Sequence, residues 1–314
     1  MKKNKYPIHP DFKRWANTNP PIHRAILPVM QKVIRSLEKK ETSSDKLTVT
    51  NVTIAVAKGQ KIKALLYSPV GIGDDAPCLV YYHGGGFVFP AAPHHYSLVR
   101  EYSPGARCHV LLVDYRLAPR YPFPTAPKDC YAAYCWLISH AKKFSIDTNR
   151  VAVGGDSAGG QLAAVVSLMA RDHSQVMPCG QLMIYPVTGR GVVTESMQQF
   201  DDTPMCNSRD VKKYDKLYIQ SPIRGKQEYA SPLDAGSLEG MPPTYIETAE
   251  FDCLRDEGKL FAERLKQAGV SVEYHQTKGT IHGFDIVLES PIVRDCVDKR
   301  IRFLRTVFEQ GDLS

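Results

Sequence analysis

The chain has 314 residues, of which 43% are hydrophobic, and its formal net charge is +7. This length and apolar content suit one large domain, or one domain with an inserted cap, and argue against disorder over most of the chain. No Lys/Arg run is long enough for a nucleic-acid patch and no apolar run reaches the ~18 residues of a membrane span, so we expect no nucleic-acid partner and no membrane span.

The chain begins with a helix pattern and a strand pair. From Pro21 onward, apolar residues recur at three- and four-residue steps, which predicts an amphipathic helix with Pro28 as a kink. Its apolar stripe consists of Ile26, Leu27, Met30, Val33, Ile34 and Leu37. Residues 47–57 and 61–67 then alternate apolar and polar side chains around a short turn, which indicates an antiparallel hairpin.

The pattern then changes to short apolar runs separated by helical segments. Such runs are typical of parallel strands buried on both faces, and alternation with helices predicts a doubly wound α/β sheet of about eight strands. The strand runs lie at 78–82, 110–113, 151–153, 182–185 and 245–246, followed by a more polar, edge-like strand at 270–275. The helical segments lie at about 126–143, 157–171, 255–268 and 292–309.

One interval breaks this alternation. From about 187 to 227 no strand pattern is present, and compact domains seldom carry so long a bare loop. We interpret it as a cap insertion that works together with the N-terminal helix. The predicted organisation is therefore an N-terminal cap segment (1–45), an α/β domain (46–186 and 229–314) and a cap insertion (187–228).

The pentapeptide from Gly155 to Gly159 matches G-x-S-x-G at a junction from strand to helix. In a nucleophile elbow, small neighbours allow a sharp turn that lifts the serine hydroxyl, here that of Ser157, above the sheet. The alternative is a glycine-rich turn that only lets a helix pack close to a strand. A P-loop is excluded because Gln161 and Leu162 stand where Lys and Ser/Thr would follow, and the glycine spacing does not fit a dinucleotide fingerprint.

A second glycine-rich loop, His83-Gly84-Gly85-Gly86, follows the strand that ends at Tyr82. Three consecutive glycines cost backbone entropy, and close approach of the backbone to a ligand is one reason to keep them. Bare N–H groups of such a loop, with the N–H of the residue after the nucleophile, form an oxyanion hole. The alternative is a flexible turn, but the two loops together favour the catalytic interpretation.

A nucleophilic serine needs a histidine base and an orienting carboxylate. Three histidines follow Ser157 in the chain, and only His282 falls in a loop after a strand, where active sites of open α/β sheets lie. His173 ends the elbow helix, and His275 belongs to the last strand. The acid candidates follow the strand at 245–246 and are Glu250, Asp252 and Asp256. We favour Asp252, because Asp256 is expected in the first turn of the next helix, where the helix dipole favours a carboxylate in any case.

Taken in order, these motifs resemble the hormone-sensitive-lipase-like branch of the α/β-hydrolase carboxylesterases. The resemblance rests on five blocks between residues 83 and 284: HGGG at 83–86, DYRLAP at 114–119, GDSAGG at 155–160, Asp252 ahead of Leu-Arg-Asp, and HGF at 282–284. It departs from the family at Arg120, where an acidic residue is frequent, and at Cys253, where proline is common.

The resemblance implies an α/β-hydrolase fold and ester hydrolysis without a cofactor or metal. Ser157 would attack the acyl carbon, His282 would act as base, and Asp252 would orient the imidazole. The backbone N–H groups of Gly85, Gly86 and Ala158 would form the oxyanion hole. His83 and Asp156 are interpreted as structural groups.

The predicted function is hydrolysis of short to medium acyl esters of small molecules. An amidase or deacetylase would use the same triad, and a non-catalytic ligand-binding protein of the same fold is the alternative of another class. Five cap residues were considered as pocket walls or core: Phe12, Trp15, Phe200, Met205 and Tyr218. The edge-like last strand offers an edge for a homodimer.

The eight cysteines contain no C-x-x-C pair, and several lie inside apolar strand or helix patterns. These features favour reduced, mostly buried thiols over a disulfide framework. The basic N-terminus lacks the apolar segment of a secretory signal, so the predicted compartment is the cytoplasm.

Overall fold

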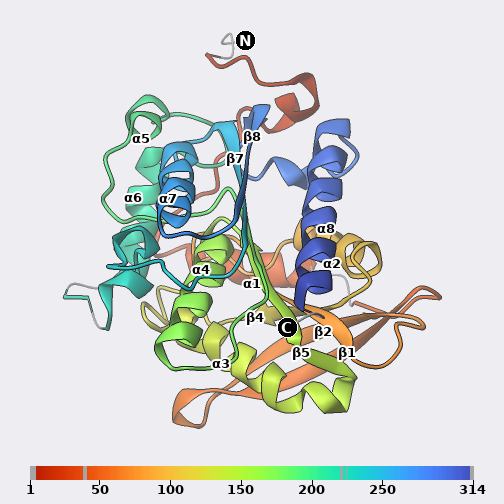
Figure 1. Cartoon of the computed structure of the whole chain (residues 1–314). Coiled ribbons are helices and arrows are strands. Elements are labelled where there is room, and N and C mark those ends of the chain that lie inside the picture. The colour runs from red at the N-terminus through yellow and green to blue at the C-terminus, as the bar shows by residue number, and fades with distance from the viewer. Residues whose placement is uncertain (1–4, 38–40, 220–221, 224, 312–314) are drawn as a thin grey trace.

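The computed structural model describes residues 5–37, 41–219, 222–223 and 225–311. A sheet of eight strands runs through the molecule in the order β1-β2-β4-β3-β5-β6-β7-β8 (Figure 1). Strand β2 is antiparallel to both of its neighbours, and all other neighbouring strands are parallel, as the sequence predicted. The strands are β1 (Leu47–Ala55), β2 (Lys61–Pro69), β3 (Ala76–Tyr82), β4 (His109–Asp114), β5 (Ile146–Asp156), β6 (Gln181–Ile184), β7 (Thr244–Phe251) and β8 (Val272–Ile281).

Helices cover both faces of the sheet (Figure 1). One face buries apolar side chains against α3 (Thr125–His140), α4 (Ala158–Asp172) and α7 (Arg255–Gln267). The opposite face packs against α2 (Pro93–Gly105) and α8 (Pro291–Gly311). Short 3-10 helices complete the connections: η1 (Pro10–Trp15), η2 (Ala57–Gly59), η3 (Ala141–Phe144), η4 (Gln227–Tyr229), η5 (Pro232–Asp234) and η6 (Phe284–Ile286). Both faces of the sheet are thus buried, which explains the continuous apolar runs of its central strands.

Two helices differ from the sequence-based expectation. Helix α2 was not predicted, because prolines stand near both of its ends and its apolar periodicity is weak. Helix α1 (Leu27–Leu37) begins at Leu27, so Pro28 lies in its first turn instead of forming a kink. Proline is tolerated there because the first-turn N–H groups have no partner inside the helix. The predicted stripe is only partly buried, since Ile26 and Val33 are exposed, and the side chain of Leu37 lies outside the described part of the chain.

In the interval from 187 to 227, the described residues form two helices joined by irregular segments. It contains α5 (Glu195–Gln199) and α6 (Ser208–Tyr218), and among its described residues there is no strand. Thr194 caps α5 by accepting the N–H of Met197, and Asn207 caps α6 by accepting the N–H groups of Arg209 and Asp210. This segment connects β6 to the sheet elements that follow it.

A buried ion cluster ties α8 to the sheet. The Arg300 guanidinium is fully buried and donates to Glu247 of β7 at 2.6 Å and to Asp285 at 3.1 Å. The same group donates to the Tyr102 hydroxyl of α2 at 2.9 Å. Because Asp285 follows His282 closely in the chain, this cluster also anchors the loop that carries that histidine.

All eight cysteines are free thiols, and six of them are buried, which confirms the prediction made from their positions. Cys253, at the position where the resembled family commonly has proline, is buried, as is Cys206 in the interval from 187 to 227. None of the helices in the described ranges is long and apolar enough to cross a membrane.

Candidate active site

Ser157 lies in a sharp turn between β5 and α4. Its backbone has a φ of 53°, a left-handed conformation that is strained for a residue with a side chain. The turn is possible because Gly159 brings the helix against β3: a Cβ on Gly159 would lie 1.8 Å from the carbonyl oxygen of Tyr82. Every residue of α4 from 158 to 170 is buried, so the core fixes the position of the turn.

The structure brings Ser157, His282 and Asp252 together. The Ser157 Oγ is 2.9 Å from Nε2 of His282, and Nδ1 of His282 is 2.7 Å from Oδ2 of Asp252. Asp252 and His282 directly follow β7 and β8, which are neighbours in the sheet, so their side chains meet at its carboxyl edge. The other oxygen of Asp252 accepts the N–H of Leu254 at 2.9 Å, which fixes the orientation of the carboxylate.

The remaining candidates lie elsewhere. Glu250 accepts the N–H of Gly279 at 2.6 Å, and Asp256 accepts the N–H of Ser196 at 2.7 Å, so both carboxylates hold neighbouring segments together. His173 contacts the carbonyl of Met169 at the end of α4, and His275 pairs with Glu273 on β8.

The electrostatics of the site favour a charged imidazole. Burial lowers the pKa of His282, but the Asp252 carboxylate outweighs this effect and raises that pKa to about 9. An imidazolium is therefore well stabilised next to the Ser157 hydroxyl.

The glycine loop presents unpaired donors on the other side of Ser157. Gly85 and Gly86 have φ values of 108° and 60°, which favour glycine, and both residues line the same cavity as Ser157. Within the described part of the chain, the N–H groups of Gly85, Gly86 and Ala158 have no hydrogen-bond acceptor. The ring of Tyr214, from α6, covers the loop so closely that a Cβ on Gly86 would lie 2.4 Å from its Cδ1 atom.

Asp156, which precedes the serine, joins three elements around this loop. Its carboxylate accepts the Tyr81 hydroxyl at 3.0 Å, the N–H of Gly84 at 3.0 Å and Nε2 of His95 at 3.1 Å. Burial alone would raise the pKa of Asp156, but its contacts with His95 and the Tyr81 hydroxyl hold it below its usual range. The sequence interpretation of Asp156 as a structural group agrees with these contacts. His95 was missed, because it lies on the unpredicted helix α2 and belongs to no recognised motif.

His94, His95 and Asp156 form a cluster whose polar atoms lie within 4.8 Å of one another. In the described structure, Nδ1 of His95 accepts the N–H of Ala92 at 2.8 Å, so its Nε2 carries the proton donated to Asp156. The cluster is thus arranged as a hydrogen-bond network, because neither ring nitrogen of His95 has a lone pair directed at a shared ion. The absence of a metal or cofactor requirement stays a prediction.

A cavity of about 770 Å³ opens over Ser157 and His282. Its wall is mostly apolar and includes Met30 and Ile34 of α1 together with Val211 and Tyr214 of α6. Of the five cap residues considered from the sequence, Trp15 and Met205 line this cavity. The other three are core residues: Phe12 packs on Phe284, Phe200 on Phe251, and Tyr218 stacks on Phe87.

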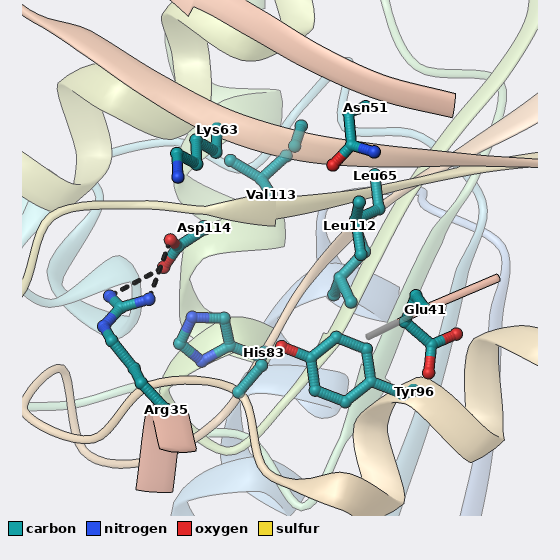
Figure 2. A pocket seen from close by; sticks show the side chains of 12 residues that line it. Arg35, Glu41, Asn51, Lys63, Leu65, His83, Tyr96, Leu112, Val113 and Asp114 are labelled. Atoms are coloured by element: carbon teal, nitrogen blue, oxygen red, sulfur yellow. Dashed lines mark hydrogen bonds and ion pairs between the residues drawn. The ribbon is translucent and has the colours of Figure 1, made fainter. Parts of the chain in front are cut away.

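His83 faces away from this cavity, into a smaller one of about 290 Å³ (Figure 2). Its ring stacks on Tyr115 at 4.4 Å, and its Nδ1 donates to the carbonyl oxygen of Gly84 at 2.7 Å. Burial lowers the pKa of His83 to about 4, so the ring is neutral and supports the loop by packing. Figure 2 shows this ring between Tyr96 and the ion pair that joins Arg35 to Asp114 at 2.9 Å.

The amino-acid sequence is similar to those of known esterases. A family described as alpha/beta hydrolase fold matches residues 79–286. Carboxylic ester hydrolase LipN from Mycobacterium tuberculosis is 40% identical over 242 residues, covering 75% of this chain and 64% of that protein. Carboxylesterase NlhH from the same organism is 33% identical over 282 residues, covering 88% of each chain. The matched regions span 64% of the length of LipN and 66% of that of esterase LipI, also from this organism.

Solved structures show the same similarity over nearly the whole chain. A protein described as bacterial heroin esterase superposes with a TM-score of 0.84 at 32% identity, covering 96% of this chain and 98% of that one. Esterase LipW from Mycobacterium marinum superposes with a TM-score of 0.88 at 28% identity, covering 96% of both chains.

Proposed function

The chain belongs to the α/β-hydrolase fold family, in its hormone-sensitive-lipase-like branch of carboxylic ester hydrolases, and from this membership we propose that it hydrolyses carboxylic esters. The observation that carries the proposal is the continuous hydrogen-bonded path from Ser157 through His282 to Asp252, at 2.9 and 2.7 Å. The path lies at the floor of an apolar cavity, where an ester can meet the hydroxyl.

In the proposed mechanism, His282 Nε2 takes the Ser157 proton while Oγ attacks the acyl carbon. The electron pair of the carbonyl bond moves to its oxygen, and the tetrahedral intermediate then expels the alcohol, which receives the proton from His282. Water repeats the sequence on the acyl-enzyme and releases the acid. Asp252 keeps the imidazole in the required tautomer and stabilises its charged form, in agreement with the raised pKa of His282.

Gly85, Gly86 and Ala158 are the proposed oxyanion hole. Their N–H groups have no acceptor among the described residues, which leaves them available for the charge that develops on the acyl oxygen. Donors fixed by a rigid backbone need no reorganisation when the charge appears.

Residues 1–45 and 187–228 are proposed to form the cap over the catalytic domain (46–186 and 229–314). The support is that both segments line the same cavity, through Trp15, Met30 and Ile34 on one side and Met205, Val211 and Tyr214 on the other. The mostly apolar wall favours small-molecule esters with short to medium acyl chains. A homodimer through β8, which lies at the edge of the sheet, and a cytoplasmic location stay predictions.

The test is hydrolysis of p-nitrophenyl esters of increasing acyl length by the full chain. Ser157→Ala is expected to lower kcat by at least about a thousandfold, because the nucleophile is lost. Ser167→Ala is the matched control, since Ser167 is a buried serine of the same helix that donates to the Ala163 carbonyl and lies outside the cavity. The control should retain wild-type activity. If the wild-type protein cleaves none of the esters but cleaves matched anilides, the proposed function becomes that of an amidase. If it cleaves neither, a ligand-binding role remains.

A further inference from the structure

Helix α1 carries apolar side chains on two of its sides. Its inner side is fixed to the domain: Leu27 is fully buried, and Gln31 donates to the carbonyl oxygens of Val88 at 2.7 Å and Ala118 at 3.1 Å. Met30 and Ile34, on the same side, line the cavity over Ser157. The inner side therefore has a clear structural purpose.

The outer side of this helix is exposed to solvent among the residues that the structure describes. Ile26, Val29 and Val33 are 41%, 63% and 45% exposed. Val29 and Val33 are four residues apart on α1, and Ile26 precedes the first residue of the helix and accepts the N–H of Met30, so the three side chains form one stripe. They are three of the eight large apolar side chains that are exposed in the described part of the chain, and the other five do not form such a stripe. We call these three residues the outer stripe.

Positive charge accompanies the outer stripe. Between Phe12 and Leu37 the sequence has five lysines and arginines and no acidic residue, and two of the five, Lys13 and Arg14, belong to η1. Arg24, in the turn before α1, and Lys32, three positions after Val29 on the helix, are exposed, whereas Arg35 is held by Asp114. An apolar stripe flanked by cations is the composition of helices that lie in the interface of anionic membranes.

We infer that the outer stripe of α1 docks the protein on an anionic phospholipid surface, with Ile26, Val29 and Val33 in the headgroup boundary. The opposite side of this helix lines the cavity, so docking would place that cavity next to the lipid. Esters that partition into the membrane would then reach Ser157 with a short path through water. Docking itself does not depend on the proposed ester hydrolysis.

A second copy of this chain fits the same surface less well. In a symmetric dimer the outer stripe would face itself, and the flanking cations of both copies would be brought together without acidic partners. Three side chains are also a small contact compared with the ~800 Å² per partner of a stable interface. Anionic lipid satisfies both the apolar and the charged part of the surface.

The experiment is flotation of the full chain with vesicles of phosphatidylcholine alone or mixed with phosphatidylglycerol. We expect binding to the mixed vesicles only, weakened by salt. Val29→Asp/Val33→Asp should abolish binding, and Arg24→Glu/Lys32→Glu should weaken it by about tenfold or more, since each basic residue near an anionic surface contributes attraction. Val193→Asp is the matched control, because Val193 is 76% exposed on the insertion and outside the stripe.

Folding and activity are checked separately. The variants should keep wild-type hydrolysis of a water-soluble p-nitrophenyl ester without vesicles, which shows that the domain is intact. The inference is overturned if the wild type does not float with phosphatidylglycerol vesicles, or if the Val29/Val33 variant floats equally well. It is also overturned if light scattering shows a dimer that this variant converts to a monomer while no form of the protein binds vesicles.

Discussion

Asp156→Asn tests whether the residue before Ser157 positions the proposed oxyanion loop. The carboxylate is buried and accepts three hydrogen bonds, from Tyr81, the Gly84 N–H and His95, at 3.0 to 3.1 Å. Asparagine has nearly the same shape but is neutral, and its amide nitrogen is a donor. Tyr81 and the Gly84 N–H both donate to Oδ1 and His95 donates to Oδ2, so whichever way the amide turns, its nitrogen faces at least one of the three donors.

The expected decrease in kcat follows from the hydrogen bond that the variant loses. A hydrogen bond to a charged group contributes about 1.5–3 kcal/mol, and 1.4 kcal/mol is a factor of ten. If the loss affects mainly the placement of the Gly85 and Gly86 N–H groups in the transition state, kcat falls by about 10- to 100-fold while KM changes little. The Asp156 charge is a minor contributor to the raised pKa of His282, so the limb of the pH profile should move only slightly, to lower pH.

The assay is steady-state hydrolysis of a p-nitrophenyl ester, with thermal unfolding measured in parallel. Asp129→Asn is the matched control, because Asp129 is an equally buried carboxylate that binds Arg116 at 2.6 and 2.8 Å and lies outside the cavity. Both variants should lose stability, but only Asp156→Asn should lose kcat. A kcat within about twofold of wild type at full folding would refute the positioning role.

Other outcomes follow from the same contacts. Because the pKa of His282 is raised to about 9, kcat/KM should rise with pH up to about that value. Asp252→Asn should move this rising part of the pH profile to lower pH. If it does not move, the pairing of Asp252 with His282 is contradicted. The raised pKa of His282 also stabilises the folded state, and this contribution is complete below pH 6.5, the approximate pKa of histidine in the unfolded chain. Thermal unfolding curves should show the contribution being lost as pH rises through about 9. Gly86→Ala should lower kcat, since its Cβ would lie 2.4 Å from the Tyr214 ring, and Tyr214→Ala added to it should restore part of the activity if the clash is the cause. Arg300→Met should cost about 3–5 kcal/mol in urea unfolding, because it leaves two buried carboxylates unpaired, and a loss below about 1 kcal/mol would contradict that account.

The sequence was sufficient where a structural rule is local. Alternation of apolar runs and helices predicts the sheet, and the G-x-S-x-G spacing predicts a strained turn at Ser157, which the structure has at φ 53°. Asp252 and His282 were selected because they follow strands that end at the same edge, and the structure places the two side chains 2.7 Å apart. Their catalytic roles stay predictions until the variants are measured.

The sequence was insufficient where partners are brought together by tertiary packing. His95 and Asp156 are 61 residues apart in the sequence, and no motif or spacing predicts their contact. Tyr214 covers Gly86 only because α6 folds back over the glycine loop. Helix α2 has prolines near both ends and little amphipathic contrast, so its burial by neighbouring elements, and not its own pattern, determines its structure.

Helices α4 and α6 differ in burial, so heating should unfold them at different temperatures. Ser157 stands at the start of a helix whose residues 158–170 are all buried, whereas α6, which supplies Tyr214, buries only Ser208, Asp210 and Tyr218. Exposing α6 to water disrupts far less apolar contact than exposing α4, so its local opening is the less costly event. On warming, we expect the packing of α6 over the cavity to be lost before the turn at Ser157 unfolds. A heated sample that is cooled before the core melts should then regain the proposed esterase activity.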